Sequence, residues 1–404
     1  MISAKQSAAV SSPEPILRPR MPELDTLRGI AVLSVVLFHA FGFTYGLQGL
    51  SGIPKLLVAA TLPGWVGVNL FFVLSGFLIT GILLDTRGRE DYYRRFYLRR
   101  ALRILPIYYA VLILLAVLSR TGIIARPASW AFLGLSFIYL ANVTNLFGVT
   151  MQYGVLWSLA VEEHFYLLWP TAAKFFSRRG VTVLAMAICV GCPMLRAFYF
   201  WRGYNTGDGY TWLSADGLAL GALLAIAVRG WFNARAKFVR LALAALGVSL
   251  VLFTAGAPLG IFRASRMLGL SLRDSALNLF FFALISLTLV LGTSRWRWIA
   301  NRPTLRFLGE ISYGVYLIHM LIFDVVDRGY ERLAPHLMAT PGNFPFMVLR
   351  FFVAGICTLL VAYLSRWYFE EPFLRLKERL EAKPAPAKPV AQPSPIAIGE
   401  LNED

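Results

Sequence analysis

The sequence predicts an all-α fold, a polytopic bundle of transmembrane helices, and two observations predict it. First, 57% of the 404 residues are hydrophobic and only 15% are charged, which is too apolar for one water-soluble core. Second, the apolar residues gather in runs of roughly 17 to 21 residues, each long enough to cross a bilayer as a helix. We therefore expect an integral membrane protein embedded in the lipid bilayer.

Ten such runs set the expected order of spans, beginning near residues 27, 66, 104, 156, 181, 212, 239, 275, 308 and 345. An eleventh apolar stretch, Trp130 to Phe147, is less regular. If it crossed the membrane, every later Lys and Arg cluster would change sides, contrary to the positive-inside rule. The sequence thus predicts about ten spans, one re-entrant or interfacial segment, and both termini in the cytoplasm.

The polar ends of the chain predict tails around a single domain. Residues 1–22 are polar, and residues 381–404 are rich in Pro and Ala, so we expect disordered cytoplasmic tails around a transmembrane domain at 23–380. The net charge of +17 comes from short basic clusters between apolar runs. This pattern favours membrane topology over binding to nucleic acid. Three cysteines are too few for a disulfide scaffold, and no metal-ligand cluster is expected.

Two residues stand out in the first apolar run: Arg28 and, eleven positions later, His39. A helix rises 1.5 Å per residue, which separates them by ~16 Å along the axis. With Arg28 at one membrane face, His39 lies past the bilayer centre. An ionisable side chain at that depth indicates a functional site.

A pair of carboxylates, Glu162 and Glu163, falls in the outer half of the fourth span, level with His39. Neighbouring residues on a helix point about 100° apart, so only one can face the histidine, and we favour Glu162, one turn from Tyr166. An imidazole held by a carboxylate can deprotonate a hydroxyl. A buried His–Glu hydrogen bond could equally serve only helix packing, and the spacing leaves both interpretations open.

A second cluster precedes the third span, where Arg100 and Arg103 share one helix face. Together with Arg28 they could form a cationic mouth that binds a polyphosphate, since arginine is well suited to bidentate phosphate contacts. The alternative is that these arginines anchor the helix to anionic lipid and set the topology.

Taken together, these residues resemble the membrane-bound acyltransferase-3 family, the ten-span O-acyltransferases that modify polysaccharides, lipopolysaccharide, Nod factors and macrolides. The resemblance extends from Leu24 to Lys377. It is carried by Leu24–Gly29 leading to His39, Phe71–Leu78, Arg100–Pro106, Trp157–Tyr166, Ser312–His319 and Glu371–Phe373, in that order and spacing.

The resemblance implies an acyl-CoA donor, most often acetyl-CoA, whose phosphates contact Arg28, Arg100 and Arg103. It also implies that His39 is the general base, with Glu162 as the family's acid. The acceptor would be a hydroxyl of a saccharide or glycolipid of the cell envelope, and the location the bacterial inner membrane. Further candidates for substrate contact are Ser75, Glu163, His164, Tyr166, Asp216 and His319.

Several of these residues also have simpler interpretations. His164 stands where the family usually has Gln, and Ser214 where a basic residue is common, which leaves the role of Asp216 open. His319 could be a core histidine bonded to Ser312 or Tyr316. Ser75, with its neighbour Gly76, could permit close helix packing rather than line a donor tunnel.

Two other function classes are less consistent with the sequence. A transporter or flippase for a lipid-linked glycan predicts repeated halves with interrupted helices at corresponding positions, and the sequence has no such repeat. A membrane glycosyltransferase usually has a large external loop with acidic residues near its first span. Here that loop, from about Phe41 to Pro63, is short and lacks Asp and Glu.

Overall fold

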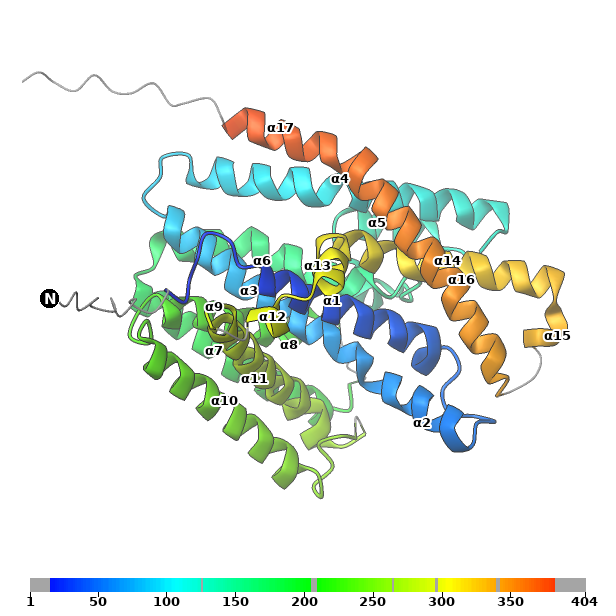
Figure 1. The fold of residues 1–404 in the computed structure, drawn as a ribbon, viewed down its shortest axis with the longest axis horizontal. Coiled ribbons are helices and arrows are strands. Elements are labelled where there is room, and N and C mark those ends of the chain that lie inside the picture. The colour runs from blue at the N-terminus through cyan, green and yellow to red at the C-terminus, as the bar shows by residue number, and fades with distance from the viewer. Residues whose placement is uncertain are drawn as a thin grey trace, which may run out of the picture.

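The fold is helical throughout the part of the chain that the structure describes. The computed structural model describes residues 15–124, 126–204, 209–263, 265–294, 297–338 and 342–381. Over these ranges it contains helices, turns and irregular segments but no β-strand (Figure 1). The predicted all-α bundle is therefore confirmed.

Each of the ten predicted apolar runs forms a helix within the described ranges. In chain order they are α1 (Pro22–Leu37), α3 (Gly67–Thr86), α4 (Tyr92–Thr121), α6 (Leu156–Phe175), α7 (Arg178–Trp201), α9 (Asp216–Val228), α10 (Arg235–Gly256), α11 (Met267–Gly292), α14 (Ser312–Leu333) and α16 (Phe344–Leu364).

Most of these helices meet the length and hydropathy expected of a membrane span. Among the described residues, seven helical segments do so, or eight if α13 (Pro303–Glu310) and α14, which meet at a bend of 74°, form one span. Of the remaining two predicted spans, α6 carries Glu162, Glu163 and Lys174, and α9 has only 13 residues. The chain is thus a multi-pass membrane protein, and the total of ten spans stays a prediction.

Shorter elements connect the long helices. They are η1 (Phe38–Phe43), α2 (Gly52–Thr61), η2 (Leu62–Val66), α5 (Trp130–Phe137), η3 (Ala141–Phe147), α8 (Thr211–Ser214), α12 (Arg297–Ala300), α15 (Pro335–Met338), η4 (Ser365–Glu370) and α17 (Glu371–Glu381). The stretch from Trp130 to Phe147 is split into α5 and η3, with Tyr139 between them at a φ of 59°. Neither piece is long enough to cross a bilayer, as expected for a re-entrant or interfacial segment.

Small residues allow α3 and α9 to approach closely at the centre of the bundle. A Cβ atom on Gly76 would lie 1.9 Å from the carbonyl oxygen of Leu218, and one on Gly221 would lie 2.1 Å from that of Val73. Only glycine fits at such backbone contacts. The predicted packing role of Gly76 is confirmed.

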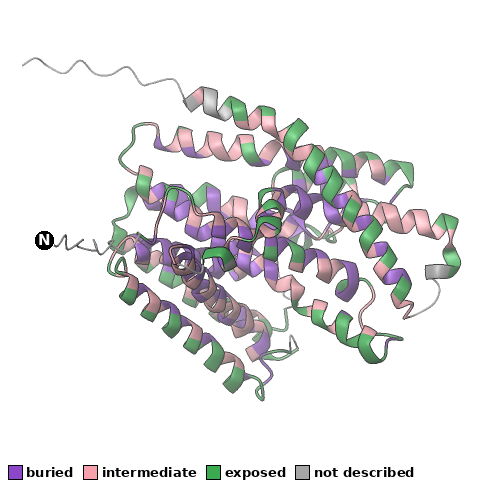
Figure 2. Ribbon diagram, in the orientation of Figure 1, coloured by how far each residue is buried: buried purple, intermediate pink, exposed green. Residues whose placement is uncertain are grey.

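The outer helices expose apolar side chains, as lipid-facing helices do. Figure 2 shows green, exposed residues along α10 and α16, whereas the interior of the bundle is purple. The exposed residues include Val190 and Met194 on α7, Val251 on α10 and Ile356 on α16. Water would not favour this surface, but a bilayer does.

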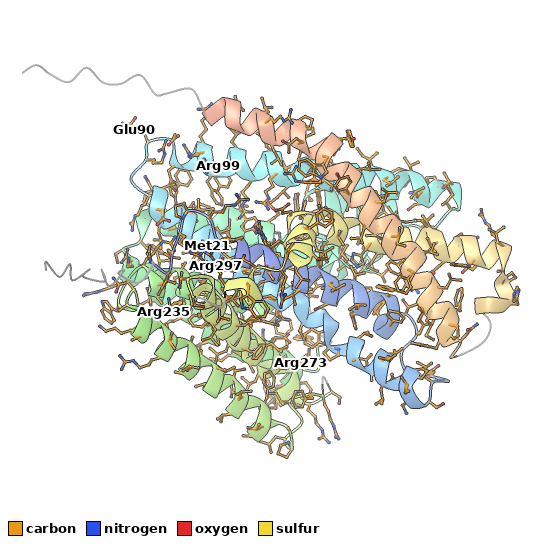
Figure 3. All side chains as sticks on the ribbon, viewed as in Figure 1. Met21, Glu90, Arg99, Arg235, Arg273 and Arg297 are labelled. Atoms are coloured by element: carbon orange, nitrogen blue, oxygen red, sulfur yellow. The ribbon has the colours of Figure 1, made fainter. Side chains whose placement is uncertain are left out.

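Both described chain ends lie on one side of the bundle. Figure 1 shows the first described residues, just before α1, and the end of α17 toward the same side of the molecule. In Figure 3, Arg99, Arg235 and Arg297 lie toward that side, and Arg273 lies farther from it. We call this side the terminal face.

The predicted tails fall mostly outside the described residues, which exclude 1–14 and 382–404. Residues 15–21, which the sequence assigned to a disordered tail, are instead packed against the bundle. Ile16 is buried, and Arg18 donates a hydrogen bond of 3.0 Å to the carbonyl of Gly292 and pairs with Glu23. The prediction was wrong there because Glu23, fully buried at the start of α1, binds a cation from the preceding segment.

Candidate active site

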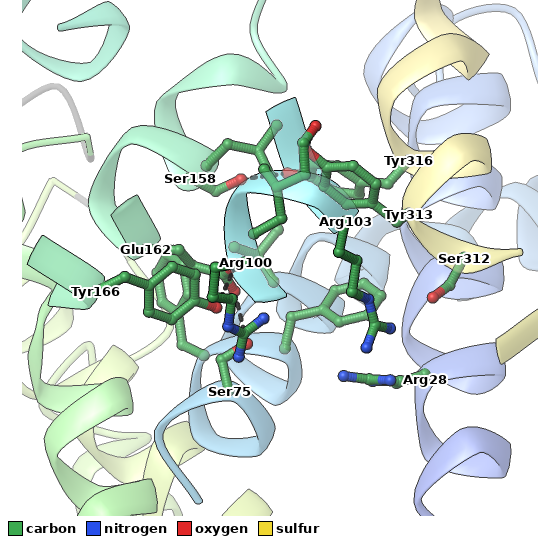
Figure 4. Close-up of a pocket in the computed structure, with 15 residues that line it drawn as sticks. Arg28, Ser75, Arg100, Arg103, Ser158, Glu162, Tyr166, Ser312, Tyr313 and Tyr316 are labelled. Atoms are coloured by element: carbon green, nitrogen blue, oxygen red, sulfur yellow. Dashed lines mark hydrogen bonds between the residues drawn. The ribbon is translucent and has the colours of Figure 1, made fainter. Parts of the chain in front are cut away.

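Three arginines from two helices meet in one pocket of about 80 Å³ (Figure 4). Arg28 comes from the first two turns of α1, and Arg100 and Arg103 come from α4. Arg28 also lies 3.7 Å from the carboxylate of Asp25. The predicted cluster is therefore present, and we call this cavity the arginine pocket.

The carboxylate of Glu162 forms part of the wall of the arginine pocket. Its two oxygens accept hydrogen bonds from the Ser75 hydroxyl at 2.9 Å and from the Tyr166 hydroxyl at 3.0 Å. The guanidinium of Arg100 lies 4.5 Å from the centre of the Tyr166 ring, a cation–π geometry. Glu162, Ser75 and Tyr166 thus form one fixed unit that faces the arginines, as the close-up in Figure 4 shows.

The predicted pairing of His39 with Glu162 is wrong. Within the described structure, the polar partners of the His39 ring are the carbonyl of Val35, at 3.0 Å, and the ring of His319, at 3.2 Å. The reason is directional: Glu162 lies on the part of α6 that faces α3, whereas His39 faces α14. The two residues line different cavities, which adjoin each other.

His39 lies in a π-helical turn, η1, which continues α1. Such turns are rare and often mark functional sites. Side chains satisfy two of its carbonyl groups: the Thr44 hydroxyl donates to His39 at 2.7 Å, and Arg350 donates to Ala40 at 2.9 Å. Arg350 is itself buried and forms a two-pronged ion pair with Asp327. An ion pair between the buried Arg350 and the partly buried Asp327 thus holds the turn that carries His39.

The contacts of His319 assign the protons of both imidazoles. Its Nδ1 lies 3.1 and 2.8 Å from the carbonyls of Val315 and Tyr316, which only accept hydrogen bonds, so Nδ1 carries the proton. In the neutral ring, Nε2 is then an acceptor. The Nδ1–H of His39 donates to it and to Val35, and Nε2 of His39 is left as the basic nitrogen.

The same contacts decide between the two expected partners of His319. It does bond to Tyr316, through the backbone carbonyl. Ser312 instead donates to the carbonyl of Gly309 at 2.8 Å. His319 is fully buried, so it touches His39 but is not itself open to a substrate.

A larger cavity of about 540 Å³ adjoins the arginine pocket, and we call it the larger chamber. His39, Asn69, Asn142, Trp157 and Asp216 are among the residues that line it. It shares three lining residues with the arginine pocket, namely Val68, Phe72 and Tyr316. The two cavities are therefore separated by a partition one side chain thick, in which the hydroxyls of Tyr316 and Ser158 lie 2.6 Å apart.

The remaining candidates divide between the cavities and the protein matrix. Ser75 and Tyr166 line the arginine pocket, whereas Glu163 and His164 line neither that pocket nor the larger chamber. The Nδ1 atom of His164 lies 2.7 Å from the hydroxyl of Thr211. Asp216 lines the larger chamber, where its carboxylate binds Arg196 at 2.9 Å and Ser275 at 2.6 Å.

Several residues of the site were missed in the sequence. Arg196 and Arg350 are buried arginines inside apolar helices, and a charge in such a run could have identified them. Asn69 and Asn142 also line the larger chamber. Asparagines carry no comparable signal, because their role depends on which helices are neighbours.

Comparison with known proteins gives consistent matches. The model of the acyltransferase domain family matches residues 21–367. The chain is 27% identical to the peptidoglycan O-acetyltransferase OatA of Listeria monocytogenes over 383 residues, covering 88% of this chain and 56% of that protein. It is 26% identical to a Staphylococcus aureus protein provisionally named an O-acetyltransferase, covering 87% of this chain and 57% of that one.

A third relative matches over a shorter stretch. A Bacillus subtilis protein provisionally named a peptidoglycan O-acetyltransferase, YrhL, is 34% identical over 165 residues, which is 37% of this chain and 23% of that protein. The chain spans little more than half the length of the first two relatives. Because the family's domain model covers most of its length, from residue 21 to residue 367, this chain belongs to the acyltransferase-3 family.

Proposed function

We propose that the protein is an O-acyltransferase that moves an acetyl group from acetyl-CoA to a hydroxyl of a cell-envelope saccharide. The observation that carries the proposal is that the arginine pocket lies next to the chamber that contains His39, with only one layer of side chains between them, which includes Val68, Phe72 and Tyr316. The names of the Listeria and Bacillus relatives, which refer to peptidoglycan, support a polymeric envelope glycan as the acceptor.

The arginine pocket supports binding of the phosphates of coenzyme A. Arg28, Arg100 and Arg103 converge on one cavity, whereas arginines that only anchor a helix to lipid would extend outward to the headgroups. The side chain of Arg28 is only 20% exposed, which also differs from an arginine that extends to the headgroups. A guanidinium cluster of this kind binds phosphate through charge-assisted, bidentate hydrogen bonds. The thioester arm would then extend past Tyr316 toward His39.

His39 provides the base for the reaction. Its Nε2 takes the proton of the acceptor hydroxyl as the oxygen attacks the thioester carbonyl. A C–O bond forms, the C–S bond breaks, and the coenzyme A thiolate leaves and takes the proton back from the imidazolium. While the ring is charged, its Nδ1–H donates to Val35 and His319, which fixes the ring and stabilises the positive charge.

The direction of the reaction follows from where the donor is available. Acetyl-CoA is a cytoplasmic metabolite, and Arg28 lies near the beginning of α1, toward the terminal face. We therefore place the terminal face, and both termini, in the cytoplasm of a bacterium, with the protein in its inner membrane. The acceptor reaches His39 from the opposite face.

A deletion strain tests the proposal. Envelope glycans from the deletion strain, complemented with wild type or His39→Ala, are compared by mass spectrometry for O-acetyl groups. His336→Ala serves as the control, because His336 is exposed on α15 and lines neither cavity. We expect acetylation with wild type and with His336→Ala, and none with His39→Ala.

Two results would contradict the proposal separately. Normal acetylation by His39→Ala, inserted at normal abundance, would exclude His39 as the base. Unchanged glycans in the deletion strain itself would exclude the envelope saccharide as the acceptor.

A further inference from the structure

His39 lies where two cavities meet. The larger chamber is on one side, and on the other is a cavity of about 240 Å³, which we call the smaller chamber. His39, Phe43 and Met320 line both. The smaller chamber is also lined by Gln152 and Arg126. A ligand in either chamber can therefore reach the same imidazole.

Both chambers are at the end of the bundle away from the arginine pocket. The larger chamber includes Trp65, just before α3 begins, and Asp274, in the first turns of α11. The smaller chamber includes Ile124, just after α4 ends, and Arg350, in the first turns of α16. The chambers thus continue each other at the face opposite the proposed entrance of the donor.

The charges that line the chambers are balanced. The described residues of the larger chamber include Arg196, Arg273, Asp216 and Asp274, and those of the smaller chamber include Arg126, Arg350, Asp324 and Asp327. Most are held in ion pairs: Arg196 with Asp216, Arg273 with Asp274 at 3.2 Å, and Arg350 with Asp327. An acceptor without net charge fits these walls, because no surplus charge awaits a counterion.

The polar and aromatic groups fit a sugar. Trp65 and Trp157 line the larger chamber, and Arg273 stacks on Trp65 at 4.5 Å from its ring centre. Aromatic rings in a cavity wall suit the apolar C–H face of a pyranose ring. Asn142 is only 4% exposed, and its Oδ1 has no hydrogen-bond partner within the described part of the chain, whereas its amide group donates to Gly209 and Thr211. A buried acceptor left unpaired is costly, and a small movement of this part of the chamber wall on binding would let a sugar hydroxyl satisfy it.

The sizes favour more than one sugar unit. A cavity of about 540 Å³ lies within the range of roughly 300–1,000 Å³ that accommodates drug-sized ligands, and the smaller chamber extends it beyond His39. Resting on the function proposed above, we infer that the acceptor is an uncharged oligosaccharide that crosses His39, with sugar units in both chambers. The acetylated hydroxyl then belongs to an interior unit of the chain.

A series of saccharides of increasing length tests this inference. Envelope glycan from the deletion strain is partly hydrolysed and separated by size and by charge. Each fraction, from one sugar unit to about eight, is incubated with the purified full-length protein and isotope-labelled acetyl-CoA. We expect kcat/KM to rise at least tenfold between one unit and three, and tandem mass spectrometry to place the label on interior units of uncharged chains.

Variants of the smaller chamber make the test specific to it. In Gln152→Ala and Arg126→Ala, the ratio of kcat/KM for three units to that for one unit should fall toward one. Arg332→Ala is the matched control, because Arg332 is an exposed arginine that lines neither chamber and donates to Gly122 at 3.0 Å. It should keep the wild-type ratio.

The outcomes distinguish the inference from the proposed function. Single sugars acetylated as efficiently as longer chains, label confined to terminal units, or transfer only to charged fractions would each overturn the inference and leave the acyltransferase proposal intact. Transfer to none of the fractions would overturn the proposed function, and the inference with it.

Discussion

The imidazole rings of His39 and His319 meet with Nδ1 and Nε2 3.2 Å apart and ring centres 5.0 Å apart. The sequence assigned the task of orienting His39 to a carboxylate, and the structure assigns it to a second, neutral histidine. Backbone carbonyls fix the proton of His319 on Nδ1. The Nε2 atom of His319 can therefore only accept a hydrogen bond from Nδ1 of His39. This contact leaves Nε2 of His39 free to act as a base toward a substrate.

Replacing His319 should lower activity through the position of His39. His319→Leu removes the nitrogen that accepts a hydrogen bond from His39. We expect kcat to fall about a hundredfold, because a misplaced catalytic group can cost that much in rate, with little change in the KM for acetyl-CoA. His319→Gln keeps a carbonyl oxygen near the place of Nε2 and should restore part of that loss. The measurement is steady-state kinetics with purified protein. Equal loss of activity in both variants, at equal thermal stability, would show that the hydrogen bond accepted from His39 does not determine the activity.

Neutralising the arginine pocket should weaken donor binding. Hydrogen bonds to charged groups contribute about 1.5–3 kcal/mol, so Arg103→Gln should raise the KM for acetyl-CoA roughly tenfold to a hundredfold. Titration of the variant with acetyl-CoA measures this effect. Arg120→Gln is the control, because Arg120 lies on the same helix but stacks on Trp130, 4.3 Å from its ring centre. An unchanged KM in Arg103→Gln would favour a topological role for the pocket arginines.

The sequence predicted much of the fold and the cluster of arginines in the arginine pocket, for identifiable reasons. Long apolar runs dictate helices regardless of their neighbours. Arg28, Arg100 and Arg103 fall at the ends of apolar runs, where their depth follows from residue counts. The partner of His39 could not be obtained this way. It depends on the π-helical turn at Phe38–Phe43 and on which helix packs beside that turn. No periodic pattern of residues in the sequence reveals either feature.

The ion pair between Arg350 and Asp327 should stabilise the fold and the turn at His39. Arg350→Leu leaves the carboxylate of Asp327 without its partner and Ala40 without its donor. Breaking a fully buried pair typically costs about 3–5 kcal/mol, and this pair, whose Asp327 side chain is 19% exposed, should cost somewhat less. We expect a lower melting temperature in detergent, largely restored in the double variant Arg350→Leu/Asp327→Leu, while acetyl transfer stays low in both. Full activity in the double variant would mean that the contact with Ala40 does not position His39.

The contact between α3 and α9 should tolerate no added methyl group at Gly76. A Cβ atom there would lie 1.9 Å from the backbone oxygen of Leu218, so the helices must separate, and overpacking of this kind costs about 1–3 kcal/mol or more. Gly247→Ala is the matched control, because a Cβ atom on Gly247, inside α10, meets nothing within 4 Å. The control should gain up to about 1 kcal/mol from helix propensity. Thermal unfolding in detergent should therefore shift in opposite directions, and a Gly76→Ala protein as stable as wild type would show that this contact can widen without loss.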